Sequence, residues 1–561
     1  MSDNRTIPVY QALAEDILAL GIHTVFGLMS DDTAVFAVAL DGLGIKFHGA
    51  RHENNAIAMA EGYAYTTGEL GVAIIGRGPA TANGLHAAVA ASRMGSKLLV
   101  IYGDAPIPGG AVNTMGPDYK GFNAQAVLGA SGLRVFTAAS PDTARATLVD
   151  ALVAANQGGL SALLLPTNVQ MASTSAGSPA VARKAAARKP AAARAQSIDA
   201  AVALLSKANR PVIVAGMGAH KAGAKQALEA LADKTGALLM TSARGKDMFH
   251  GHKLNCGVLG SFSHSMGRRM MDQADCVVVF GAGLNFFTMS FGHSVPPVPI
   301  IQVDVVRAHI GRWTTADVSV VGDAKIVAEQ MLAALPTQPG SNKPFHAPES
   351  LATLAAFDIV KDFQPANTPR TVDPRSLGVE LNKLLPRERN IVYDAGNFLS
   401  ILPYLTVPTP GHLKMTSEFA SIGLGFGTAM GVAKGSPDPT ILVIGDGAFL
   451  MTMGELETVV REDIPLVIVV MNDCAYGAEL HFLAMRNLPV EKSVFPDVDF
   501  APVAAAFGFE AHTIRTLDEL RALAPLLAKP EGPIFLDCKL NADIAAPFMS
   551  EFAAFEARHH G

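Results

Sequence analysis

The sequence has little of several features that would assign a function at once. Its 561 residues include one tryptophan and only four cysteines, at 256, 276, 474 and 538, with no C-x-x-C pair and no metal-ligand spacing. So few thiols in so long a chain argue against a disulfide scaffold and indicate a reducing compartment. No P-loop, H-E-x-x-H or G-x-S-x-G motif occurs, which removes the sequence signatures of three large enzyme classes.

Long hydrophobic runs and a strong net charge are also missing. No apolar stretch approaches the roughly 20 residues needed to cross a bilayer. The N-terminus, MSDNRTIPVY, lacks the basic segment and apolar run of a signal peptide. The net charge of −6 gives no support for nucleic-acid or membrane binding. We therefore expect a cytoplasmic protein whose partners are small molecules rather than nucleic acids or membranes.

What the sequence does have is the composition of a well-packed α/β protein. It is 49% hydrophobic and 17% charged, with 52 glycines, and its length predicts about three or four domains. Short β-rich runs such as GVAIIG, PVIVAGMGA and TILVIGDG alternate with helix-like segments such as VYQALAEDILALG, which favours parallel sheets flanked by helices.

Two stretches rich in Ala, Pro and Ser resemble exposed linkers and divide the chain. The first, residues 173–196, is basic but lacks the interleaved aromatic residues of a nucleic-acid-binding arm. The second begins at Pro336. We predict three α/β domains, each with a mainly parallel sheet, at residues 1–173, 197–335 and 371–561.

A glycine-rich loop in the predicted central domain suggests a dinucleotide site. GMGAHKAG, residues 216–223, follows the strand PVIVA, but its spacing is G-x-G-x4-G, and no acid stands about 20 residues on. We favour a tight strand-to-helix turn, with a bound flavin or other nucleotide as the open alternative.

Two acids stand at the ends of two apolar strands in the third predicted domain. Asp446, in the turn GDG, follows TILVI, and Asp473 follows PLVIVVM 27 residues later. This spacing is typical of one β-α-β crossover, so both acids should lie at the carboxyl ends of neighbouring strands, where open α/β sheets bind ligands. GDG alone is also explained by an Asx turn.

A cation would explain this pair of acids. The two carboxylates have no basic residue nearby in sequence and would repel each other without one. Oxygen-only ligands suit Mg²⁺ or Ca²⁺, with phosphate oxygens completing the shell. Gly445 and Gly447 would let the backbone approach a phosphate at the start of the following helix.

The pattern G-D-G, about 27 residues and then N-D resembles the cofactor motif of the thiamine diphosphate enzymes. RHENNAIAMAEGYA (51–64) is similar to the segment that carries the cofactor-activating glutamate of that family, and GPATANG (78–84) is similar to its G-P-G-x-x-N turn. The resemblance covers the whole chain and is strongest to the acetohydroxyacid synthase, pyruvate decarboxylase and benzaldehyde lyase branch.

The resemblance implies an enzyme that uses thiamine diphosphate and Mg²⁺. Its first domain would bind the cofactor's pyrimidine and its third domain the diphosphate, beside a central α/β domain. The site would form between two subunits, which implies a homodimer at least and commonly a homotetramer.

Carried onto this chain, the resemblance implies specific roles. Asp446 and Asp473 would bind the metal through their side chains, and Ala475 through its backbone carbonyl. Most members have Asn in place of Asp473, and we expect metal binding to persist with the added charge. Glu53 would hydrogen-bond the aminopyrimidine ring and act in catalysis, with a plain helix-start glutamate as the alternative. Cofactor contacts are further implied for Asn397, Ile422, Gly445, Gly447, Ala448 and Tyr476, for some of which turn or packing roles are the alternative.

Two further acids are candidates for proton transfer at the substrate. Asp31, in FGLMSDD, and Glu479, in AYGAELHF, align with acids of the 2-oxo acid decarboxylases. An Asx turn and a helix-start acid are the alternatives.

Two departures from the relatives' patterns bear on the reaction. Where the decarboxylases carry a His-His pair, this chain has VN at 112–113, and the side chain of Asn113 cannot titrate. Where acetohydroxyacid synthases have F-Q, it has FN at 122–123. We therefore predict a carbon–carbon lyase or carboligase that acts on 2-hydroxy ketones, aldehydes or 2-oxo acids through an acyl carbanion. A 2-oxo acid decarboxylase, a flavin-assisted 2-oxo acid oxidase and a non-catalytic scaffold are the alternatives.

Overall fold

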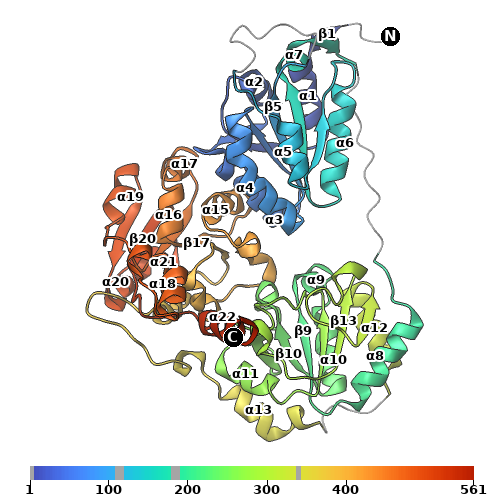
Figure 1. Ribbon diagram of the computed structural model, residues 1–561, viewed down its shortest axis with the longest axis vertical. Coiled ribbons are helices and arrows are strands. Elements are labelled where there is room, and N and C mark those ends of the chain that lie inside the picture. The colour runs from blue at the N-terminus through green and yellow to red at the C-terminus, as the bar shows by residue number, and fades with distance from the viewer. Residues whose placement is uncertain (1–4, 108–118, 178–189, 337–342, 561) are drawn as a thin grey trace.

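The computed structural model describes residues 5–107, 119–177, 190–336 and 343–560 and arranges them in three α/β units (Figure 1). Each unit contains a six-stranded sheet, and the strand pairs within these sheets are parallel. The predicted α/β class with three mainly parallel sheets is confirmed, whereas the predicted domain boundaries stay predictions.

The N-terminal unit has the strand order β3-β2-β4-β5-β7-β6. The strand β4 is buried along its whole length, as expected of a parallel strand covered by helices on both faces. The elements of this unit are β1 (Thr6–Pro8), α1 (Val9–Ala19), β2 (Thr24–Gly27), α2 (Ala34–Gly42), β3 (Lys46–Gly49), α3 (Glu53–Thr67), β4 (Gly71–Ile75), α4 (Pro79–Met94), β5 (Leu98–Asp104), α5 (Ala124–Ala130), β6 (Arg134–Thr137), α6 (Ala144–Asn156), β7 (Leu160–Pro166), α7 (Thr167–Met171) and β8 (Ser173–Ser175).

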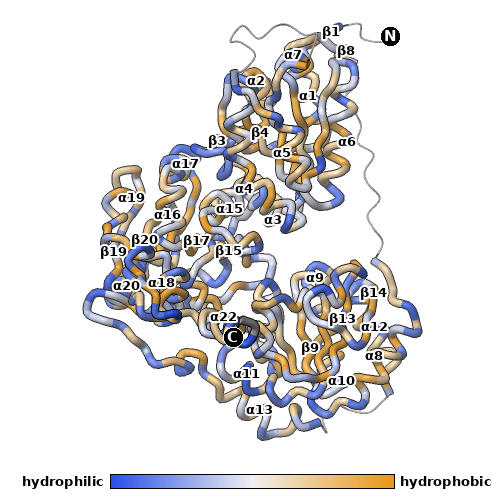
Figure 2. Tube along the Cα trace, viewed as in Figure 1, coloured by the Kyte–Doolittle hydropathy of each residue, from blue (hydrophilic) through white to orange (hydrophobic). Residues whose placement is uncertain are grey.

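The central unit has the strand order β11-β10-β9-β12-β13-β14. Hydrophobic residues colour its inner strand β9 in Figure 2, and all five residues of that strand are buried. The elements are α8 (Ala195–Lys207), β9 (Pro211–Ala215), α9 (Met217–Lys221), α10 (Lys225–Thr235), β10 (Leu238–Thr241), β11 (Asn255–Val258), α11 (Ser265–Met271), β12 (Cys276–Phe280), β13 (Ile300–Asp304), β14 (Val318–Val321) and α12 (Ala324–Ala334).

The C-terminal unit has the strand order β16-β15-β17-β18-β20-β19. Helix α13 (Pro348–Ala355) precedes it, and short 3-10 turns occur between several elements. Its elements are α14 (Pro374–Leu384), β15 (Asn390–Tyr393), β16 (Leu413–Met415), α15 (Gly425–Gly435), β17 (Thr440–Gly445), α16 (Asp446–Thr452), α17 (Glu455–Arg461), β18 (Leu466–Asn472), α18 (Gly477–Ala484), α19 (Ala501–Phe507), β19 (Glu510–Ile514), α20 (Leu517–Ala522), α21 (Ala524–Ala528), β20 (Ile534–Lys539) and α22 (Pro547–His560).

The N-terminal and C-terminal units meet where α3 lies against α15 (Figure 1). One hydrophobic cluster spans this contact and contains Ile57 and Met59 of α3 together with Phe426 of α15. The two backbones approach closely, since a Cβ added at Gly431 would lie 1.9 Å from the carbonyl oxygen of Met59. This contact brings the start of α3 toward the loops of the C-terminal sheet.

The linker predictions need two corrections. Residues Ser173–Ser175 form β8, which pairs antiparallel with β1 and closes the N-terminal unit, because Ser and Thr suit a short strand as well as a linker. The second predicted linker contains a 3-10 turn, Pro344–His346, and the start of α13. No helix within the described ranges is both long and apolar enough to cross a membrane.

Candidate active site

The two acids predicted to bind a metal meet at one edge of the C-terminal sheet. The strands β17 and β18 pair in parallel with Gly445 opposite Met471, so Asp446 and Asp473 follow the ends of adjacent strands. The backbone amide of Ala475 donates a hydrogen bond toward both carboxylates. The juxtaposition expected from their spacing is therefore present, and their role as ligands stays a prediction.

The electrostatics of this pair fit a divalent cation. Burial raises the pKa of Asp446 to about 7. Burial, together with the charge of Asp446, raises the pKa of Asp473 to about 8. A cation between them would offset both effects, and hard carboxylate oxygens suit Mg²⁺.

We expect Mg²⁺ affinity to depend steeply on pH. Because the pKa values of both carboxyls are raised, protons occupy the cation-free site below about pH 7 and must leave when the metal binds. Affinity should therefore fall roughly ten- to a hundredfold for each pH unit below 7. Calorimetric titration with Mg²⁺ alone at pH 6, 7 and 8 measures this.

The control for the pH effect is Asp473→Asn, which removes one of the two titrating groups and should make the pH dependence shallower. Equal Mg²⁺ affinity at pH 6 and pH 8 in the unaltered protein would contradict the predicted site.

Residues around the pair pack closely. A Cβ at Gly477 would lie 2.3 Å from Oδ2 of Asp473 and 3.2 Å from Cβ of Asn397, and one at Gly447 would lie 2.7 Å from the ring of Tyr476. The side chain of Asn397 donates to the carbonyl of Ile544 at 2.9 Å and accepts from the amide of Ala546 at 2.8 Å. Since its side-chain amide is engaged in both directions, the backbone of this turn is the better candidate for a diphosphate contact. The other predicted contact residues lie at the same edge: Gly445 ends β17, and Ala448 is buried in α16.

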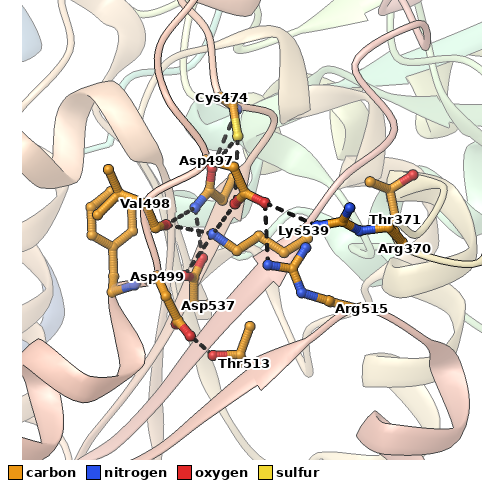
Figure 3. A network of polar contacts seen from close by, with 12 residues as sticks. Arg370, Thr371, Cys474, Asp497, Val498, Asp499, Thr513, Arg515, Asp537 and Lys539 are labelled. Carbon is orange, nitrogen blue, oxygen red and sulfur yellow. Dashed lines mark hydrogen bonds and ion pairs between the residues drawn. The ribbon is translucent and has the colours of Figure 1, made fainter.

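An ion-pair network centred on the buried Lys539 holds the loop of Asp473 from the neighbouring strand β20. In Figure 3, Lys539 of β20 extends between the carboxylates of Asp497 and Asp537, at 2.9 and 3.0 Å. The other oxygen of Asp537 accepts from the side chain of Asn472 at 2.8 Å. Asn472 in turn accepts from the backbone amide of Cys474 at 3.2 Å. The loop that carries Asp473 is thus fixed on both sides of that residue.

Asp394 holds the loop that presents Ile422. The carboxylate of Asp394 accepts the backbone amides of Gly423 at 3.1 Å and Gly425 at 2.8 Å. Burial raises the pKa of Asp394 to about 6, although these amides act to lower it. Ile422 itself packs, partly buried, against the cluster shared with α3.

Glu53 begins α3 and is partly buried. The side chain of Asn83, in the segment GPATANG, donates to Oε2 of Glu53 at 3.1 Å. Gly84 lies against the same side chain, since a Cβ there would be 3.7 Å from Cβ of Glu53. Both motifs of the N-terminal unit that carry the family resemblance therefore meet at this glutamate.

His86, one turn further along α4, is a titratable group that the sequence did not single out. Its Nε2 lies 2.6 Å from the hydroxyl oxygen of Ser421, which precedes Ile422. Burial lowers the pKa of His86, which favours the neutral ring. It links the N-terminal unit to the loop of Ile422.

Asp31 lies on the surface in the loop after β2. Lys120 forms an ion pair with it, and the hydrogen bond from Lys120 holds the pKa of Asp31 below its usual range. Lys120 also pairs with the buried neighbour Asp32 at 2.9 Å. An acid held in its ionised form is poorly suited to donate a proton, so this pairing weakens the predicted relay.

The structure describes two of the remaining substrate-side residues, Glu479 and Asn123. Glu479 is exposed in the first turn of α18, while Asn113 lies outside the described residues. Asn123 caps α5 by accepting the amide of Ala126 at 3.0 Å, which gives it a structural role in the N-terminal unit.

The central glycine loop is explained by packing. A Cβ at Gly216 would lie 2.3 Å from the carbonyl oxygen of Gly281, and one at Gly218 would lie 2.8 Å from the Cα of Gly281. The backbones that follow β9 and β12 are therefore in close contact, which leaves no room for a side chain at Gly216 or Gly218. This contact accounts for the glycines without a dinucleotide.

Family models support this arrangement of the three units. The N-terminal TPP binding domain model of the thiamine pyrophosphate enzymes matches residues 7–126, the central domain model matches 198–331, and the C-terminal TPP binding domain model matches 394–538. The chain belongs to the thiamine pyrophosphate enzymes, and it is an enzyme whose binding domains indicate thiamine diphosphate as cofactor.

Curated relatives in this family span nearly the full length. The chain is 28% identical to the sulfoacetaldehyde acetyltransferase of Castellaniella defragrans, over 95% of this chain and 91% of that one. It is 26% identical to the "Probable acetolactate synthase large subunit" of Methanocaldococcus jannaschii, over 96% of this chain and 93% of that one. It is also 23% identical to the 2-hydroxyacyl-CoA lyase 1 of Mus musculus, over 95% of this chain and 94% of that one. The three names describe an acetyltransferase, a synthase and a lyase, so the relatives differ in both reaction and substrate.

Proposed function

We propose that this enzyme is a thiamine diphosphate- and Mg²⁺-dependent carbon–carbon lyase or carboligase. It acts on 2-hydroxy ketones, aldehydes or 2-oxo acids. The observation that carries the proposal is the placement of Asp446 and Asp473 at the ends of the neighbouring strands β17 and β18, and Glu53, held by Asn83 in the N-terminal unit, supports it. When bound, the cofactor supplies a carbon nucleophile for the substrate carbonyl.

Separate residues of the chain would bind the metal, exchange the proton and support the cofactor. Asp446, Asp473 and the carbonyl of Ala475 would hold Mg²⁺ and, through it, the diphosphate. Glu53 would exchange a proton with the ring nitrogen of the aminopyrimidine, with Asn83 fixing the carboxyl. Ile422 would support the cofactor from the side of the C-terminal unit.

The substrate side supports ligation over release of an aldehyde. An enzyme that releases an aldehyde, after decarboxylation or after cleavage of a 2-hydroxy ketone, needs an acid to protonate carbon, whereas in ligation a second carbonyl compound takes the place of that proton. Here Asp31 is paired with Lys120, and Glu479 is exposed. A 2-oxo acid decarboxylase remains the alternative.

The reaction can be assigned with a panel of substrates. The enzyme, with Mg²⁺ and thiamine diphosphate, is incubated with pyruvate, benzoylformate, acetoin or benzoin, and the products are identified by NMR. We expect cleavage or formation of a 2-hydroxy ketone, and no turnover by the Asp446→Ala variant. Release of aldehyde from 2-oxo acids alone would support the decarboxylase. A yellow protein that consumes oxygen would support the flavin-assisted oxidase, and an unreactive panel would contradict the proposed substrate class.

We further propose that the enzyme works as a homodimer at least, and as a homotetramer if dimers pair. A subunit contact would cover some of the exposed apolar side chains, which include Met29, at 55% exposure, and Met451, at 61%. Mass photometry of the enzyme with Mg²⁺ and cofactor should give a mass of two or four chains, and a single-chain mass for the active enzyme would contradict it.

A further inference from the structure

We propose that Glu455 is a positioning residue that caps α3 from the opposite unit and so holds Glu53 in place. The inference rests on the proposed function, because the residue it positions is the predicted activating acid. It concerns a buried carboxylate to which neither the motif spacing nor the family resemblance gives a role.

The geometry places the carboxylate of Glu455 at the very start of α3. Its Oε1 accepts the backbone amides of Arg51 at 3.0 Å and His52 at 3.1 Å. The same oxygen accepts the side-chain amide of Asn55 at 2.9 Å. These donors flank Glu53 on both sides in the sequence, and all belong to the N-terminal unit.

The chemistry of a helix start explains why this contact matters. The backbone amides of Arg51 and His52 lie just before Glu53, the first residue of α3, and the aligned peptide dipoles of the helix favour a negative charge there. The N-cap residue of α3, His52, accepts from the amide of Asn54 at 3.1 Å. Glu455 is 1% exposed, so its hydrogen bonds are charge-assisted and shielded from water. Without it, the buried side-chain amide of Asn55 and the backbone amides of Arg51 and His52 would lose this partner.

The carboxylate is itself fixed from its own helix. The hydroxyl of Thr458, one turn further along α17, donates to Oε2 of Glu455 at 2.6 Å. Since α16 begins at Asp446 and α17 at Glu455, one short segment carries both a predicted metal ligand and the cap of the helix that bears Glu53. That segment therefore links a predicted metal-binding residue to the start of the helix that bears Glu53 in the same chain.

A matched control exists on the same helix. Glu457 also crosses to the N-terminal unit, but it contacts the side chain of Arg51, at 2.6 Å, and its own side chain is 28% exposed. Glu457→Gln removes an ion pair at this boundary and leaves the backbone cap intact. Comparing this variant with Glu455→Gln therefore distinguishes a loss of contact between the units from a loss of the hydrogen bonds that position the start of α3.

The test compares Glu455→Gln with Glu457→Gln by two measurements. Hydrogen–deuterium exchange of the cofactor-free protein reports the amides of residues 51–55. We expect these to exchange at least about tenfold faster in Glu455→Gln and unchanged in Glu457→Gln. With Mg²⁺ and thiamine diphosphate bound, NMR of the quenched cofactor reports the exchange rate of its C2 proton. We expect this rate to fall about tenfold or more in Glu455→Gln, because a small displacement of Glu53 is costly, while cofactor affinity changes little.

The outcomes are distinguishable. Unchanged amide exchange and C2 exchange in Glu455→Gln would overturn the positioning role. A wild-type protein that binds no thiamine diphosphate would instead overturn the proposed function, and the amide measurement would still report on the cap. Should Glu455→Gln fail to fold, Thr458→Val is the second variant, because it keeps Glu455 and removes the hydroxyl that holds its carboxylate. Smaller increases in amide exchange and smaller decreases in C2-proton exchange would support the inference. Wild-type values of both rates would overturn it.

Discussion

Replacing Glu53 with Gln is expected to abolish turnover while leaving the metal site intact. The variant keeps the size of the side chain and an oxygen that can accept from Asn83, which lies 3.1 Å away in the wild type. It cannot gain or lose the proton that general acid–base catalysis requires, so turnover should fall by at least about 10²-fold. Steady-state rates and the C2-proton exchange of the bound cofactor measure the loss.

Binding measurements complete this test. Mg²⁺ affinity should be unchanged, because Asp446 and Asp473 lie on the C-terminal sheet edge and do not depend on the charge of Glu53. Glu69→Gln, which changes an exposed glutamate just after α3, is the matched control and should behave as the wild type. Full activity of Glu53→Gln would disprove the mechanism, and loss of Mg²⁺ binding would show that the residue is structural instead.

The parts of the site that follow from local pattern could be predicted from the sequence. Two apolar strands and the length of one crossover between them can be recognised in a single stretch of sequence. Because the strands β17 and β18 pair in parallel, the residues that follow them, Asp446 and Asp473, lie at the same edge of the sheet. The glycine spacing of GMGAHKAG, with no acid about 20 residues on, predicts a tight turn there, and the packing of Gly216 on Gly281 explains it.

The supporting residues could not be predicted, because their partners lie far away and have no side-chain signature. Glu455 binds the backbone amide of Arg51, 404 residues earlier, and Asp394 binds that of Gly425, 31 residues later. Any residue offers a backbone amide, so no pattern marks these pairs. Asp31 illustrates the opposite case: its loop position was predicted, but the ion pair with Lys120, 89 residues on, depends on the tertiary fold.

Gly431→Ala is expected to lower both stability and activity, because Gly431 lies where α15 contacts α3. The added methyl group would lie 1.9 Å from the carbonyl oxygen of Met59 and 2.9 Å from its Cα. Backbone atoms on α3 cannot rotate away as a side chain could, so the helices must separate. Such overpacking costs about 1–3 kcal/mol, against a gain in helix propensity of up to about 1 kcal/mol.

The functional loss from Gly431→Ala should exceed the loss of stability. A shift of about 1 Å between α3 and α15 would displace Glu53, and a displacement of that size can lower a rate about 10²-fold.

Gly62→Ala should act in the same way from the other helix, because its methyl group would lie 2.1 Å from the carbonyl oxygen of Thr428. Gly129→Ala, in α5, is the control, since nothing lies within 4 Å of its added Cβ, and it should be neutral or slightly stabilising. Thermal unfolding and C2-proton exchange measure both consequences, and wild-type values for Gly431→Ala would mean that the two helices are not in contact in the working enzyme.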